Sequence, residues 1–147
     1  MKIKVTVTLI LLSLTSFIMI LAQATASETI DLSGEWDAIF IRMREEVGNT
    51  FDAEEDVVKI IQNGNEFIGR CMIGAKRRGK NEEAVKGKLS NGKLEEIFLS
   101  YPIDQITYKL AWSKGRANIN EKGNLILFYS ALQDEPVHLT FVLKRRK

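Results

Sequence analysis

The stretch VVKIIQNGNEFIGRC (residues 57–71) decides the fold, because it holds two β-prone runs joined by the tripeptide NGN at 63–65. Asn-Gly readily supplies the positive φ angles of a tight hairpin turn. Residues 57–62 and 66–73 are therefore predicted to form adjacent antiparallel strands. The tripeptide NGK at 91–93 has the same turn chemistry and predicts a second hairpin.

Similar short runs continue in both directions from this stretch, with turn residues about every eight to twelve positions. A third turn of the same kind is KGN at 122–124. Successive hairpins predict an all-β fold, an antiparallel up-and-down meander closed into a β-barrel of about eight or nine strands. The expected strands lie near residues 35–43, 57–62, 66–73, 84–90, 93–100, 105–112, 115–120, 124–131 and 137–144.

Alternation of apolar and polar residues predicts which faces are buried. In residues 137–144 the apolar side chains share one face, and in 105–112 the alternation places Leu110 and Trp112 on the inner face. The runs AIFIRM (38–43) and LILFY (125–129) are apolar on both faces. Either another segment covers them, or they form a contact surface for a second chain, which makes a homodimer possible.

Residues 1–26 have the pattern of a secretory signal peptide. Lys2 and Lys4 precede a long uncharged apolar run, and the small-x-small motif ATA ends at Ala26. We expect cleavage before Ser27, with AQA at 22–24 as a second candidate site. An uncleaved anchor is the alternative, because the apolar run approaches the length that spans a bilayer. Cleavage would leave one domain, residues 27–147, exported to the periplasm or the extracellular space without a stable membrane anchor.

Charge is segregated in the mature domain, which is formally neutral because Lys2 and Lys4 account for the whole-chain charge of +2. Acids gather in residues 35–56 and bases in GAKRRGKNEEAVKGKLSNGK (74–93). We expect this basic stretch to be a solvated hairpin loop followed by an outer strand face. Nucleic acid is not expected as a partner, because no aromatic residues are interleaved with the bases. The alternative is a surface for an anionic or protein partner, formed by Lys76, Arg77, Arg78, Lys80, Lys86 and Lys88.

The first predicted strand opens with Gly34-Glu35-Trp36, and the last one ends in HLTFVLKRR. With the hairpin meander, this resembles the calycin family of barrels, which comprises the lipocalins and their small bacterial lipocalin-like and avidin-like relatives. The resemblance implies that Trp36 closes the base of the barrel beneath a cation from the last strand, Lys144 or Arg145. It also implies a lid-like loop after the first strand, within residues 44–56.

A hollow barrel would line its ligand with aromatic and polar side chains at the open end. The candidate apolar walls are Trp112, Tyr108, Phe40 and Phe67, and the candidate charged anchor is Arg70 or Arg116. The alternative is that these aromatic residues fill a closed core, since a barrel of about eight strands can be filled by its own side chains.

Catalytic and metal chemistry have little support in the sequence. His138 is the only histidine and Cys71 the only cysteine; we expect a solvent-facing imidazole and a buried thiol, and we expect no zinc site. The acids at 52–56 lack the spacing of a calcium loop, so a solvated loop is expected there. We therefore expect a non-enzymatic, exported binding protein without a cofactor. It would be either a container for a small apolar molecule, or a surface-acting protein with a filled core that contacts an envelope or extracellular protein.

Overall fold

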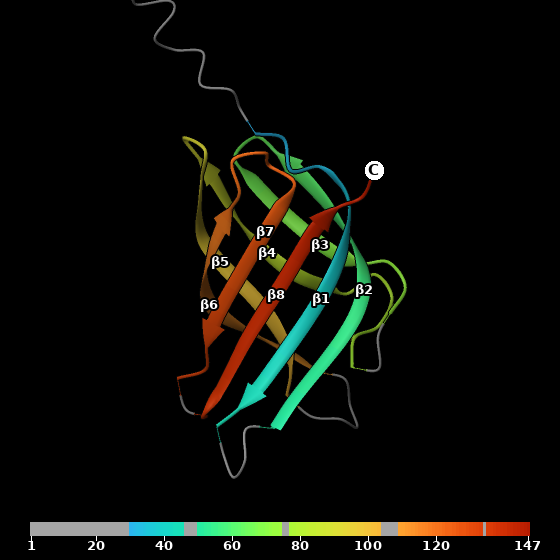
Figure 1. Cartoon of the computed structure of the whole chain (residues 1–147), viewed down its shortest axis with the longest axis vertical. Coiled ribbons are helices and arrows are strands. Elements are labelled where there is room, and N and C mark those ends of the chain that lie inside the picture. Colours follow the sequence, from blue (N-terminus) through green and yellow to red (C-terminus); the bar gives the residue numbers. More distant parts are fainter. Residues whose placement is uncertain (1–29, 46–49, 75–76, 104–108, 134) are drawn as a thin grey trace, which may run out of the picture.

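The structure is a closed antiparallel barrel in which each strand pairs with its neighbours in sequence and the last strand pairs with the first (Figure 1). This computed structural model describes residues 30–45, 50–74, 77–103, 109–133 and 135–147, so the expected signal peptide lies outside the described residues. Within these ranges no helix has the length and hydropathy needed to cross a membrane. The predicted all-β up-and-down barrel is confirmed. The strands are β1 (Gly34–Arg44), β2 (Thr50–Asn63), β3 (Glu66–Cys71), β4 (Glu83–Ser90), β5 (Lys93–Pro102), β6 (Leu110–Ile119), β7 (Leu125–Ala131) and β8 (Val137–Arg145).

The predicted hairpin turns lie where the sequence places them. Gly64, Gly92 and Gly123 have φ angles of +61°, +73° and +64°, in the left-handed region that favours glycine. These turns join β2 to β3, β4 to β5 and β6 to β7. The turn residues therefore fix three of the hairpins of the barrel.

The prediction of two strands at 105–112 and 115–120 is wrong, because Leu110–Ile119 is a single strand, β6. Its inner face carries the small residues Ser113, Gly115 and Ala117 before the larger Ile119. The inward placement of Trp112 is wrong for the same reason, since Trp112 has the opposite parity to these residues and lies on the outer face. Residues 104–108 lie outside the described residues.

The loop expected within 44–56 is largely strand, because β2 begins at Thr50 and pairs with β1 along the whole length of β1. The sequence did not indicate a strand here, because the first inward-facing positions of β2 are acidic rather than apolar. Asp52, Glu54 and Asp56 point to the same side of the strand as the buried Val58. These acids face the basic loop between β3 and β4, where Arg77 pairs with Asp52 at 2.5 Å. The acidic and basic segments thus neutralise each other at one end of the barrel.

The barrel interior is filled by its own side chains. Its largest fully buried members are Trp36, Phe128 and Phe141, each at most 1% exposed. Phe40 and Phe141 meet edge to face, with ring centroids 4.7 Å apart, a favoured aromatic geometry. Burying this apolar surface is the main term that stabilises the fold.

One end of the barrel is plugged by the segment that precedes β1. Leu32 is 0% exposed, and its carbonyl accepts the indole N–H of Trp36 at 3.0 Å. The guanidinium of Arg145 lies 4.5 Å from the Trp36 ring centroid and donates to the carbonyls of Asp31 and Ser33. The cation over Trp36 is therefore Arg145, whereas Lys144 faces Asp37 of β1.

The runs that are apolar on both faces come together on the outside of the barrel. The register places Leu127 of β7 beside Val142 of β8, and Val142 beside Ile39 of β1. Ile39 and Leu127 remain 40% and 44% exposed. Leu127, Val142 and Ile39 therefore form an apolar row across the outer faces of β7, β8 and β1, with Thr140 and Lys144 on either side of Val142.

Candidate ligand-binding cleft

The β6–β7 ladder covers only part of the two strands. The first part of β6, Leu110 to Gly115, pairs with β5, whereas its pairing with β7 is confined to Arg116–Ile119. The exchange of partners occurs at Gly115, where a Cβ atom would lie 2.6 Å from both the Tyr129 carbonyl oxygen and a Leu99 methyl. Only glycine allows the three strands to approach this closely.

A cleft of about 820 Å³ lies where β6 and β7 separate. This volume is within the range of small-molecule sites, roughly 300–1,000 Å³. Because it lies between two strand edges, side chains from both faces line it. They are Tyr101, Trp112, Ser113, Lys114, Gly115 and Arg116 on the β5–β6 side, and Tyr129, Ser130, Ala131, Leu132, Gln133 and Glu135 on the β7 side.

Two serines hold the cleft together in place of ladder hydrogen bonds. Ser130 is 2% exposed and donates its hydroxyl proton to the Lys114 carbonyl at 2.8 Å. Its oxygen lies 2.5 Å from the Ser113 hydroxyl. Because Ser130 has only one hydroxyl proton, Ser113 is the donor in this second bond. Neither serine has a proton left for a ligand.

Aromatic rings flank the cleft at its floor and at its rim. Tyr101 packs against the core from β5, and Trp112 lies on the outer face of β6. The ammonium group of Lys86 stands 4.1 Å from the Trp112 ring centroid, a cation–π distance. This contact fixes the indole on its outer side, whereas its cleft side lines the open space.

Two of the predicted ligand residues, Trp112 and Arg116, line this one cleft. Three of the others, Phe40, Phe67 and Arg70, lie elsewhere. Phe40 and Phe67 are core residues, 5% and 3% exposed. Arg70 forms an ion pair with Glu83 at 2.9 Å on the outside of the barrel, and Tyr108 lies outside the described residues.

The sequence interpretation missed the cleft serines and Tyr101. The one available signal was that Ser130 has the inward parity of its strand, between Phe128 and Leu132. A polar side chain at an inward strand position requires a hydrogen-bond partner. That partner, Ser113, lies on a strand whose alternation was misread.

The basic residues considered as a partner surface are mostly used within the fold. Arg77 pairs with acids of β2, and Lys86 covers Trp112. Lys88 pairs with Glu96 at 2.8 Å. Lys80 is exposed, and Lys76 lies outside the described residues.

Arg78 corrects the expectation of a wholly solvated loop, because it is only 4% exposed. Its guanidinium carbon lies 4.6 Å from the Phe40 ring centroid and 4.9 Å from that of Phe141. It donates to the carbonyl oxygen of Ser100 at 2.6 Å and to its hydroxyl. Burial lowers the pKa of Arg78, and the two ring faces and Ser100 replace the water that this cation loses.

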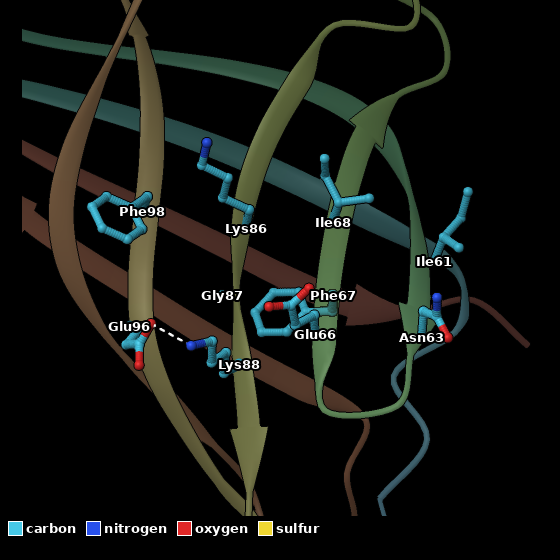
Figure 2. Close-up of a pocket in the computed structure, with 10 residues that line it drawn as sticks. All are labelled: Ile61, Asn63, Glu66, Phe67, Ile68, Lys86, Gly87, Lys88, Glu96 and Phe98. Carbon is cyan, nitrogen blue, oxygen red and sulfur yellow. Dashed lines mark ion pairs between the residues drawn. The ribbon is translucent and has the colours of Figure 1, made fainter.

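A second hollow, of about 420 Å³, lies on the outer face of β2 to β5. Figure 2 shows Ile61, Ile68 and Phe98 in a row across these strands, with Lys86 between them. The ion pair of Lys88 with Glu96 crosses the same face. Lys86 already contacts Trp112 and Lys88 already pairs with Glu96. This hollow therefore has fewer free charged groups to bind a ligand than the β6–β7 cleft.

His138 and Cys71, the only histidine and the only cysteine of the chain, are not hydrogen-bonded to each other. His138 faces outward, where it bonds the Tyr129 hydroxyl at 2.8 Å and Glu45 at 2.6 Å. Cys71 is a free thiol at 0% exposure, and burial raises its pKa to about 12. Among the described residues, no group of three or more His, Cys, Asp or Glu side chains is placed to hold a metal ion.

Searches of protein-family models, curated proteins and solved structures give no match to this chain. The closed meander is consistent with calycin-like topology.

Proposed function

We propose that the protein is an exported, non-enzymatic binding protein of lipocalin-like type that holds a small, partly apolar molecule in the β6–β7 cleft. The observation that carries this proposal is the cleft of about 820 Å³ at the point where the β6–β7 ladder ends. The barrel centre is packed with side chains, so the ligand would lie between strands rather than on the barrel axis.

The cleft combines the features of a small-molecule site: apolar surface from Tyr101, Trp112 and Leu132, and a few polar groups at its edge. Export is supported by the signal-like residues 1–26. The lipocalin-like assignment is supported by the closed meander and by the contact of Arg145 with Trp36.

The test is native mass spectrometry of the mature chain purified from its own host, followed by fluorescence. We expect an added mass of a few hundred daltons, typical of small cleft ligands, that disappears on denaturation. Trp36 and Trp112 are the two tryptophans, so Trp36→Phe leaves Trp112 as the sole reporter of the cleft. The released molecule should change the emission of this variant.

A variant with a bulky side chain in the cleft tests whether the added mass is bound there. Ala131 is exposed and lines the cleft, so Ala131→Trp should abolish the added mass while the protein remains folded. A bare chain from the native host, or an added mass unaffected by this substitution, would overturn the proposal.

A second candidate function, contact with a protein partner, is favoured by the apolar row across the outer faces of β7, β8 and β1. Single apolar residues on a surface need no explanation, but a continuous patch often marks an interface. The same native spectrum distinguishes the two candidates. A bare homodimer, or a complex with an envelope or extracellular protein, would favour the surface function.

A further inference from the structure

The rim of the cleft carries cations without a carboxylate partner. Lys114 and Arg116 alternate on β6, so their side chains leave the same outer face about 7 Å apart along the strand. Among the described residues, no acid forms an ion pair with either of them. By contrast, four other described arginines form ion pairs with carboxylates: Arg42, Arg70, Arg77 and Arg146.

Among the described residues that line the cleft, the only acid is Glu135, and its carboxylate lies 3.8 Å from Arg42. The described charged residues that line the cleft are therefore two cations without an ion-pair partner and one paired anion. An anionic group at Lys114 and Arg116 would find donors whose charge nothing else on the described rim cancels.

The floor of the cleft is chemically different from its rim. The hydroxyl protons of Ser113 and Ser130 are both used, one on the other serine and one on the Lys114 carbonyl. Leu132, 9% exposed, and Tyr101 supply apolar surface. Moving a charged group to this floor would cost free energy, because no hydroxyl donor remains to solvate it.

We infer that the cleft selects an anionic amphiphile. The acidic head binds at Lys114 and Arg116, and the apolar body lies between β6 and β7 against Tyr101 and Leu132. This inference rests on the proposed function and adds the chemical class and the orientation of the ligand. Arg116 is suited to the head because a guanidinium can hold a carboxylate, sulfonate or phosphate through two parallel hydrogen bonds.

The experiment compares two fluorescent probes with the same aromatic body. Anilinonaphthalene sulfonate carries an acidic head, and N-phenylnaphthylamine is neutral. Both are titrated into the mature chain, into Lys114→Gln/Arg116→Gln, and into the matched control Lys59→Gln/Lys122→Gln. The control removes two exposed lysines that do not line the cleft.

The rim variant should weaken binding of the sulfonate probe about tenfold, the loss of a charge-assisted hydrogen bond. Binding of the neutral probe should change less than about twofold, and the control variant should leave both probes unchanged within the same margin. Raised ionic strength should weaken only the sulfonate probe, because salt screens exposed charges.

The outcomes separate this inference from the proposed function. If Ala131→Trp prevents binding of both probes but the rim variant binds both as the parent does, the cleft binds small molecules and the inferred selectivity for anions is wrong. Tighter binding of the neutral probe than of the sulfonate overturns the inference in the same way. If Ala131→Trp displaces neither probe and the host protein carries no added mass, both proposals are overturned.

Discussion

At the scale of single residues, two arginines of the same chain region illustrate how differently a cation can be used. Arg70 is half-exposed and pairs with Glu83, whereas Arg78 is buried between Phe40 and Phe141 and bonded to Ser100. An exposed ion pair contributes little to stability, because water solvates its members almost as well when they are apart. Removal of a buried donor leaves its acceptor without a partner and opens a cavity.

Arg78→Ala should therefore lower the free energy of unfolding by about 2–4 kcal/mol. The matched change Arg70→Ala should cost less than about 1 kcal/mol. Urea denaturation of the two variants and the parent, followed by circular dichroism, measures both values. Equal losses would show that Arg78 is solvated in solution and does not close the end of the barrel.

The sequence could not distinguish Arg78 from its neighbours. Arg77, Arg78 and Lys80 occupy one basic, glycine-containing segment and have the same local signal of a solvated loop. Burial of one of them depends on where the loop crosses the barrel end, which long-range packing decides. Trp36 differs in this respect, because the resemblance to calycins implied a contact with a cation from the last strand, Lys144 or Arg145, and the structure shows that this cation is Arg145.

At the scale of elements, β6 governs both the fold and the candidate site. Its first half belongs to the ladder with β5 and its second half to the ladder with β7. Hairpins closed by Asn-Gly were predictable because the turn chemistry is local. The course of β6 was not predictable in the same way, since Ser113, Gly115 and Ala117 leave most of its inner positions small and hide the alternation of the strand.

Gly115→Ala should destabilise the protein by about 1–3 kcal/mol, the usual cost of overpacking. The added methyl would meet the Tyr129 carbonyl at 2.6 Å, and a backbone atom cannot turn aside as a flexible side chain can. We expect β7 to shift away, so that amide hydrogen exchange accelerates first at residues 116–119.

The control for this change is Asn118→Ala, an exposed position on the same strand. It should alter the free energy of unfolding by less than about 0.5 kcal/mol. Unchanged exchange at 116–119 in Gly115→Ala would mean that the close approach of β6 and β7 is not required for their pairing.

At the scale of the whole molecule, a different chain segment covers each end of the barrel. The β3–β4 loop crosses one end, where its bases meet the acids of β2. The segment before β1 plugs the other, with Leu32 against Trp36 and with Arg145 over both. The sequence showed the segregation of charge, but only the barrel topology shows that the two segments lie face to face.

The plug at the second end bears on the expected processing of the chain. Cleavage before Ser27, or at the alternative site after Ala24, leaves residues 30–33 attached to β1. The mature protein would therefore keep Leu32 in place. This segment should be part of the folded domain rather than a dispensable extension.

We expect chains that begin at Ser27 and at Ile30 to have equal free energies of unfolding, and a chain that begins at Gly34 to be less stable by at least about 3 kcal/mol. Burial of the Leu32 side chain alone is worth about 1.5–3 kcal/mol. Its loss also removes the acceptor of the Trp36 indole and two carbonyl acceptors of Arg145. Thermal and urea unfolding of the three chains provide the measurement. If the chain from Gly34 is as stable as the other two, the plug does not close the barrel and Trp36 is covered by Arg145 alone.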